Sequence, residues 1–308
     1  MSLADALQKT PLLETLEVTC LTEPSLVNAR PIILPHLRNL HLSGTTGLCA
    51  TLFRVLDIPR NARVALSPPG FEGPMSSVPM ILGRMSRILL QLTASATDAP
   101  EGAAPFAHVL SLDVVFGYEG CRLRGWRRVR ALGQWRVLAD NTPDVLLGLT
   151  RHTSVEDAVT LLSTLPLHHL QVLRIHWLPH ADTLLPYMRR LATLTALQVL
   201  VLDDISIEVV LELAAVATAQ EVWLMGIDFE GVREAISPYS PGQASSSDRW
   251  LALVEICAIR AASGLAFSRV YVEGGREINE LVVAMLREVP GTEVELLEQR
   301  PPGASRRW

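Results

Sequence analysis

The chain of 308 residues has few of the features that mark secreted or membrane-spanning proteins. Its four cysteines, Cys20, Cys49, Cys121 and Cys257, are widely spaced and form no Cys-x-x-Cys pair, which indicates reduced thiols rather than a disulfide framework. No uninterrupted apolar run of about 20 residues is present, and the N-terminus lacks a basic start followed by an apolar core. We therefore expect an intracellular protein, cytoplasmic or nuclear, without a membrane span.

Lysine and aromatic residues are also scarce. Lys9 is the only lysine among 27 basic residues, and aromatic residues make up 5% of the chain. Residues 1–150 carry 14 basic and 12 acidic side chains, a net charge of +2, whereas residues 151–308 carry 13 and 20, a net charge of −7. Neither half is basic enough to indicate a general nucleic-acid binder. The hydrophobic fraction of 49% is sufficient for a large core, so we expect a folded soluble protein.

Motifs of catalysis and cofactor binding are missing as well. No Gly-rich phosphate loop, Gly-x-Ser-x-Gly elbow or His-Glu-x-x-His pair is present. No closely spaced histidine has a cysteine or carboxylate at ligand spacing. These histidines are His36, His41, His168, His169, His176 and His180. Asp203, Asp204 and Asp228 follow expected strands, where α/β enzymes often place catalytic groups, but turn-forming aspartate is the better interpretation. The sequence predicts a protein that is not an enzyme and has no metal site or cofactor.

One short phrase recurs along the chain. It has apolar residues at positions 1, 4 and 6, and its clearest copies are Leu170–Ile175, Leu197–Leu202 and Ala219–Leu224. Because side chains alternate along a strand, positions 4 and 6 point to one face and position 5 to the other. The copies begin 27 and 22 residues apart, which is typical of leucine-rich repeats. A single copy could not bury its apolar edge, so stacking of copies into a parallel sheet is predicted.

Further strands and helices follow from the same patterns. Additional copies of the phrase are expected at residues 13–18, 37–42, 64–66, 107–112, 267–272 and 294–296, and another core strand at residues 145–149. Helical spacing predicts helices over 4–9, 49–56, 78–92, 158–165, 181–192, 250–262 and 278–289, and another after Ser206. Residues 118–139 alternate instead, which predicts an inserted antiparallel hairpin.

The predicted fold is therefore α/β. We expect an irregular leucine-rich-repeat solenoid, with a curved parallel sheet and helices on its outer face, over residues 1–299. Residues 300–308 are expected to form a polar tail.

The sheet face opposite the helices is the first candidate for partner binding. Positions 3, 5 and 7 of the phrase would lie there and include residue types enriched in protein interfaces. The residues are His41, Arg174, His176, Asp203, Trp223, Met225, Tyr271 and Glu273. The sequence leaves open whether terminal repeats or loops cover Trp223 and Met225 and make them part of the core.

An arginine cluster interleaved with tryptophan is the second candidate. Its members are Arg122, Arg124, Arg127, Arg128, Arg130 and Arg136, with Trp126 and Trp135 between them. Such a patch would suit phosphate or an acidic partner. Arginines on the wet face of a hairpin, with the tryptophans on its dry face, explain the pattern equally well.

Several stretches resemble a known family. Residues 7–18 (LQKTPLLETLEV), residues 34–44 (LPHLRNLHLSG) and the region from Ser111 to Trp126 are similar to the C-terminal repeat domain of mushroom-type fungal F-box proteins. In that family an N-terminal F-box recruits the adaptor of a cullin-RING ubiquitin ligase, and the repeats are thought to hold substrates. Here the first repeat begins within the first ten residues, so adaptor binding is expected only if an F-box lies upstream.

The function predicted from these features is non-catalytic. We expect a protein–protein interaction scaffold, and the resemblance implies the substrate-recognition region of an F-box-type ubiquitin-ligase receptor. The alternative is binding of nucleic acid or anionic lipid through the arginine cluster at residues 122–136.

Overall fold

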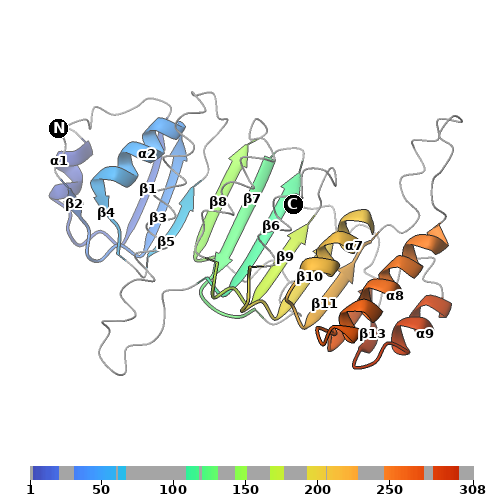
Figure 1. The fold of residues 1–308 in the computed structure, drawn as a ribbon. Coiled ribbons are helices and arrows are strands. Elements are labelled where there is room, and N and C mark those ends of the chain that lie inside the picture. The colour runs from blue at the N-terminus through green and yellow to red at the C-terminus, as the bar shows by residue number, and fades with distance from the viewer. Residues whose placement is uncertain are drawn as a thin grey trace, which may run out of the picture. The chain divides into compact units, whose positions relative to one another are not determined.

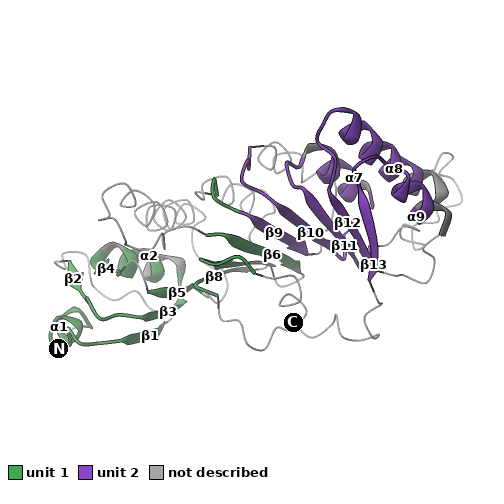
Figure 2. Ribbon diagram, turned by 90° about the horizontal axis from the view of Figure 1, so that it is seen from below, with its two compact units in different colours: residues 1–170 green, residues 171–308 purple. Residues whose placement is uncertain are grey.

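The computed structural model describes residues 3–20, 31–59, 62–66, 109–117, 120–130, 143–150, 167–176, 193–205, 207–227, 246–273 and 280–297. The chain divides into two compact units, residues 1–170 (unit 1) and residues 171–308 (unit 2), shown in Figure 2. Both units combine helices with mostly parallel strands, so the predicted α/β class is confirmed. The leucine-rich-repeat type stays a prediction. The helices expected over 78–92, 158–165 and 181–192 and the polar tail lie outside the described residues.

Unit 1 contains, in its described part, six strands of one sheet and two helices (Figure 1). In spatial order the strands are β1 (Thr15–Cys20), β3 (Asn39–Gly44), β5 (Arg63–Leu66), β8 (Val145–Thr150), β7 (Gly120–Trp126) and β6 (Ser111–Gly117). The helices are α1 (Leu3–Gln8) and α2 (Thr46–Val55). A short parallel pair, β2 (Ile32–Ile33) and β4 (Leu56–Asp57), forms a separate sheet that the sequence did not predict.

The strands β1, β3 and β5 confirm the first three copies of the phrase. They pair in parallel and in register, with Leu16 beside Leu40 and Leu40 beside Val64. These three side chains are buried, as are Leu42 and Leu66 two residues further along their strands. A spacing of 24 residues between paired positions therefore aligns one apolar row beneath the next.

The predicted antiparallel insertion is confirmed at β7, with different partners from those expected. β7 pairs antiparallel with β6 on one side and with β8 on the other. The sequence placed both strands of the hairpin within residues 118–139, whereas β6 was expected to be a copy of the parallel phrase. Residues 131–142, where the second hairpin strand was predicted, lie outside the described part of the chain.

Unit 2 has five described strands that pair with one another in parallel, in chain order. They are β9 (Val172–His176), β10 (Val199–Asp203), β11 (Glu221–Met225), β12 (Arg269–Glu273) and β13 (Glu293–Leu297). Their fourth phrase positions form one apolar row of buried residues, Leu173, Leu200, Val222, Val270 and Val294. Helices α7 (Ile207–Val216), α8 (Ser246–Ala262) and α9 (Glu280–Arg287) lie on one side of these strands (Figure 2).

A tight turn closed by two leucines precedes several strands. The amide of Leu37 donates to the carbonyl of Leu34 over 3.1 Å, and Leu170 and Leu197 donate in the same way to the residues three positions before them, Leu167 and Leu194, over 2.9 Å. All six leucines are buried. The repeating unit is therefore Leu-x-x-Leu-x-x-Leu-x-Leu, three residues longer than the phrase recognised in the sequence.

A left-handed residue follows two of the strands in unit 2. Asp204, directly after β10, has a φ of 55°, and Gly226, directly after β11, has a φ of 59°. The amide of Asp204 donates to the carbonyl of Met225 over 2.8 Å. Glycine adopts this conformation freely, and aspartate is among the residues that tolerate it best. Asp204 thus has a turn role at this position, while Asp228 lies outside the described residues.

Candidate partner-binding face

The strand face turned away from the helices, here called the open face, carries the predicted partner-binding residues of unit 2. Strand alternation places one row of side chains there, and pairing aligns Arg174, Val201, Trp223, Tyr271 and Glu295 in register across β9 to β13. A neighbouring row contains His176, Asp203 and Met225. The prediction therefore placed these residues on the correct side of the strands. Side chains alternate along a strand, so the positions of the apolar residues also show which side chains point to the opposite face.

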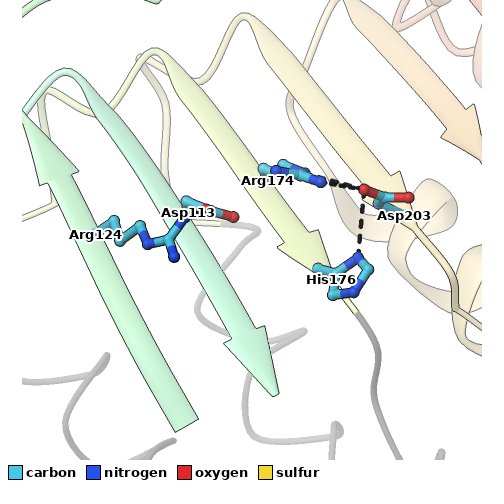
Figure 3. A network of polar contacts seen from close by, with 5 residues as sticks. All are labelled: Asp113, Arg124, Arg174, His176 and Asp203. Carbon is cyan, nitrogen blue, oxygen red and sulfur yellow. Dashed lines mark hydrogen bonds and ion pairs between the residues drawn. The ribbon is translucent and has the colours of Figure 1, made fainter. Parts of the chain in front are cut away.

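Three of these residues form a buried polar cluster (Figure 3). The Nε of Arg174 donates to Oδ2 of Asp203 over 3.2 Å, and its Nη2 pairs with the same oxygen. The Nδ1 of His176 lies 3.3 Å from that oxygen. Arg174, Asp203 and His176 are only 1%, 2% and 6% exposed. They stabilise one another inside the protein and offer no contact surface to a partner.

Burial also settles part of the question that the sequence left open at Trp223 and Met225. Met225 is 3% exposed and belongs to the core, as does Tyr271 at 8%, whereas Trp223 is half-buried. The rings of Trp223 and Tyr271 stack with their centroids 3.9 Å apart and their planes inclined by 26°. The accessible part of the predicted site in unit 2 is therefore reduced to Trp223 and Glu273.

This aromatic pair is bordered by charged side chains that were not among the predicted site residues. Arg269 lies between Glu221 and Glu293, with Nη1 3.7 Å from Glu221 Oε1 and Nε 3.3 Å from Glu293 Oε2. A hydrogen bond with the side chain of Tyr271, together with the carboxylates of Glu293 and Glu221, raises the pKa of Arg269. The register of β11, β12 and β13 places Glu221, Arg269 and Glu293 at adjacent positions on the three strands.

The open face of unit 1 is more polar. His41, the remaining predicted residue, has its Nδ1 3.4 Å from Oε1 of Glu17 on the adjacent strand, and its side chain is 42% exposed. Beside this pair, Asn39 donates to the hydroxyl of Thr15 over 3.3 Å. Thr15, Glu17 and Asn39 are exposed and His41 is half-buried, so this part of the face is open to solvent.

The arginine cluster does not form one accessible patch in the described residues. Arg124 lies on β7 opposite Asp113 of β6, with 3.8 Å between Nη1 and Oδ2, and Asp113 is 1% exposed (Figure 3). Arg130 is buried, with its guanidinium carbon 4.3 Å from the centre of the Trp126 ring. Arg127 donates from Nη2 to the carbonyl of Ala62 over 3.1 Å. These three arginines therefore have structural roles.

The rest of the cluster does not support a shared patch either. Arg122 and Arg128 are exposed, while Arg136 and Trp135 lie outside the described residues. Trp126 falls on the same side of β7 as Arg122 and Arg124 by strand alternation. The alternative that placed the tryptophans opposite the arginines is therefore wrong at Trp126. Burial of the guanidinium lowers the pKa of Arg127, the opposite of what an exposed anion-binding arginine would show.

The described residues contain neither a metal-binding cluster nor a membrane-spanning helix. Among them no group of three or more histidine, cysteine, aspartate or glutamate side chains is arranged to hold a metal ion. No helix in the described part of the chain has the length and apolar character needed to cross a bilayer.

Comparison with known proteins identified no relative of this chain. No protein-family model matches the chain, and neither the curated proteins nor the solved structures contain a match.

Proposed function

We propose that the chain is a non-catalytic scaffold that binds another protein through the open face of its strands. The observation that carries this proposal is the division of strands such as β3 and β12 into a buried apolar side and a side that bears polar or aromatic groups. On β3 the first side consists of Leu40 and Leu42, and the second of Asn39 and His41. Neighbouring in-register strands whose outer side reaches solvent, such as β1 and β3, present these side chains next to one another, which suits a macromolecular partner better than a small molecule.

The finer proposal is that this scaffold is the substrate-recognition region of an F-box-type ubiquitin-ligase receptor. Its support is the sequence resemblance at residues 7–18, 34–44 and 111–126. Binding of the ligase adaptor is proposed only for a gene product in which an F-box precedes Met1. Reading the genomic DNA immediately 5′ of the first codon for an in-frame F-box tests this point, and its absence from the gene would remove the ligase proposal while leaving the scaffold proposal intact.

Site-specific photo-crosslinking tests the scaffold proposal. A photoreactive residue is placed at Asn39 or Glu295 on the open face, and at Glu212 or Ile259 on the exposed helix side as matched controls. We expect crosslinked protein partners that are shared between cell extracts and specific to the open-face positions. Equal crosslinking from both sides, or none from the open face, would reject the proposal.

The contacts of the arginine cluster do not favour a second function in binding nucleic acid or anionic lipid. Arg124, Arg127 and Arg130 are engaged within unit 1, so a nucleic acid or an anionic lipid would meet at most a reduced set of accessible arginines.

A further inference from the structure

The open face of β11, β12 and β13 carries an excess of negative charge. The face positions of these strands hold four glutamates and one arginine, namely Glu221, Glu273, Glu293, Glu295 and Arg269. Glu293 and Glu295 are exposed, and Glu221 and Glu273 are half-buried. On the open face of unit 1, by contrast, Glu17 lies against His41. The glutamates of β11–β13 are part of the net charge of −7 in residues 151–308.

The same face already holds one guanidinium group, that of Arg269. Arg269 lies between two carboxylates, at 3.7 Å from Glu221 and 3.3 Å from Glu293. Its own side chain is 52% exposed, so this arrangement forms at the surface and not in the core. One row further along the strands, Tyr271 has Glu295 as its register partner on β13.

An apolar surface, formed by Trp223 and Tyr271, lies next to these carboxylates. The stacked rings of Trp223 and Tyr271 lie on the open face, with Trp223 half-buried. Long basic side chains pack their methylene stems on such a surface while their charged ends reach nearby carboxylates. Aromatic groups beside exposed carboxylates thus match both parts of an arginine or lysine side chain, whereas a phosphate-bearing partner would be repelled by four glutamates.

We infer that the open face of β11–β13 binds a lysine- or arginine-rich segment of a protein partner. The basic side chains of that segment pair with Glu295 and pack against Trp223, while Glu221 and Glu293 keep Arg269 in place. This inference rests on the proposed scaffold function and names the class of partner that this part of the scaffold takes.

Peptide titration tests the inference with the full chain. The probes are a fluorescently labelled arginine-rich peptide and two sequence-matched peptides in which the arginines are replaced by glutamine or by glutamate. We expect saturable binding of the first peptide, weakened by salt, and none of the other two. Glu295→Gln should weaken binding about two- to fivefold, as expected for an accessible ion pair.

A charge-matched control separates local contact from general attraction. Glu288→Gln removes one exposed carboxylate just after α9, away from the open face, and should leave the affinity unchanged. Equal weakening by Glu288→Gln and Glu295→Gln, or tighter binding of RNA or of acidic lipid vesicles than of the basic peptide, would overturn the inference. If the peptide fails to bind while crosslinking from Asn39 and Glu295 still identifies a partner, this inference fails and the scaffold proposal stands.

Discussion

An arginine that is 1% exposed must have its charge compensated within the protein. Arg174 meets this need through Asp203, which is equally buried and which also lies beside His176. Such a cluster is costly to assemble, because each ion loses its hydration, and it is more costly to break, because a buried charge remains. The three residues are therefore best regarded as part of the structural centre of unit 2.

Removal of the carboxylate from this cluster gives the first stability prediction. Asp203→Ala should lower the free energy of unfolding by about 3 to 5 kcal/mol, because the guanidinium of Arg174 loses the buried anion that it bonds. Urea denaturation followed by circular dichroism measures the change. Glu293→Ala serves as the control, since this glutamate also pairs with an arginine but is 73% exposed, and it should cost no more than about 1 kcal/mol. Equal losses for the two variants would contradict a structural role for the cluster.

At the scale of elements, Arg260 joins α8 to the end of α7. Its Nη1 donates to the carbonyls of Ala214 and Ala217 over 3.1 and 2.6 Å, and its Nη2 donates to that of Ala219 over 3.2 Å. The guanidinium carbon lies 4.0 Å from the centre of the Phe267 ring. The last carbonyls of a helix have no partner within it, and a cation there also favours the helix dipole. Burial lowers the pKa of Arg260, which remains far above neutral because arginine is so strongly basic.

The second prediction follows from this contact between two helices. Arg260→Met should lower the free energy of unfolding by about 2 to 4 kcal/mol, because buried carbonyls lose a charged donor while the side-chain volume is largely kept. Hydrogen exchange should show faster exchange at the C-terminal end of α7. Arg287→Met, at an exposed position in the last turn of α9, is the matched control and should change neither quantity measurably. Unchanged protection of α7 in the Arg260→Met variant would refute the bridging role.

Sequence patterns were informative where one local rule determines the outcome. Phrase positions 4 and 6 predicted the buried side of most strands, because alternation is a property of every strand, but Leu296 at position 6 of the last copy is 47% exposed. Arg260 was missed although its spacing from Leu253 and Cys257 places it on the buried side of α8. That signal was readable, since a charge on an apolar helix face implies a buried partner.

Other features depend on contacts between distant segments. Arg174 and Arg269 both occupy the open face of their strands, yet one is 1% exposed and the side chain of the other is 52% exposed. No local pattern separates them, because burial depends on what packs over each strand. The same holds for the pairing of β7 with β8, because the alternation of residues 118–139 predicted a partner strand within that range, whereas β8 begins at Val145.

At the scale of the whole molecule, buried thiols occur in both compact units. Cys49 on α2 and Cys121 on β7 belong to unit 1, and Cys257 on α8 belongs to unit 2. Burial raises the pKa of Cys49 and of Cys257 from 9.0 to about 11, and it raises that of Cys121 further. Since Lys9 is the only lysine, few amines titrate in the same range and the thiols contribute a large share of the alkaline response.

The third prediction is a loss of stability at alkaline pH that both units share. The neutral thiol is favoured in the folded state, so its contribution is complete below pH 9 and is lost as the pH rises from 9 through about 11. Each of Cys49 and Cys257 should account for on the order of 2 to 3 kcal/mol over that interval. Urea denaturation at a series of pH values measures the slope, and Cys49→Ala and Cys257→Ala should each flatten it, whatever cost their smaller side chains add at neutral pH. A slope that stays the same in the double variant would show that other groups, such as the four tyrosines, govern the alkaline response.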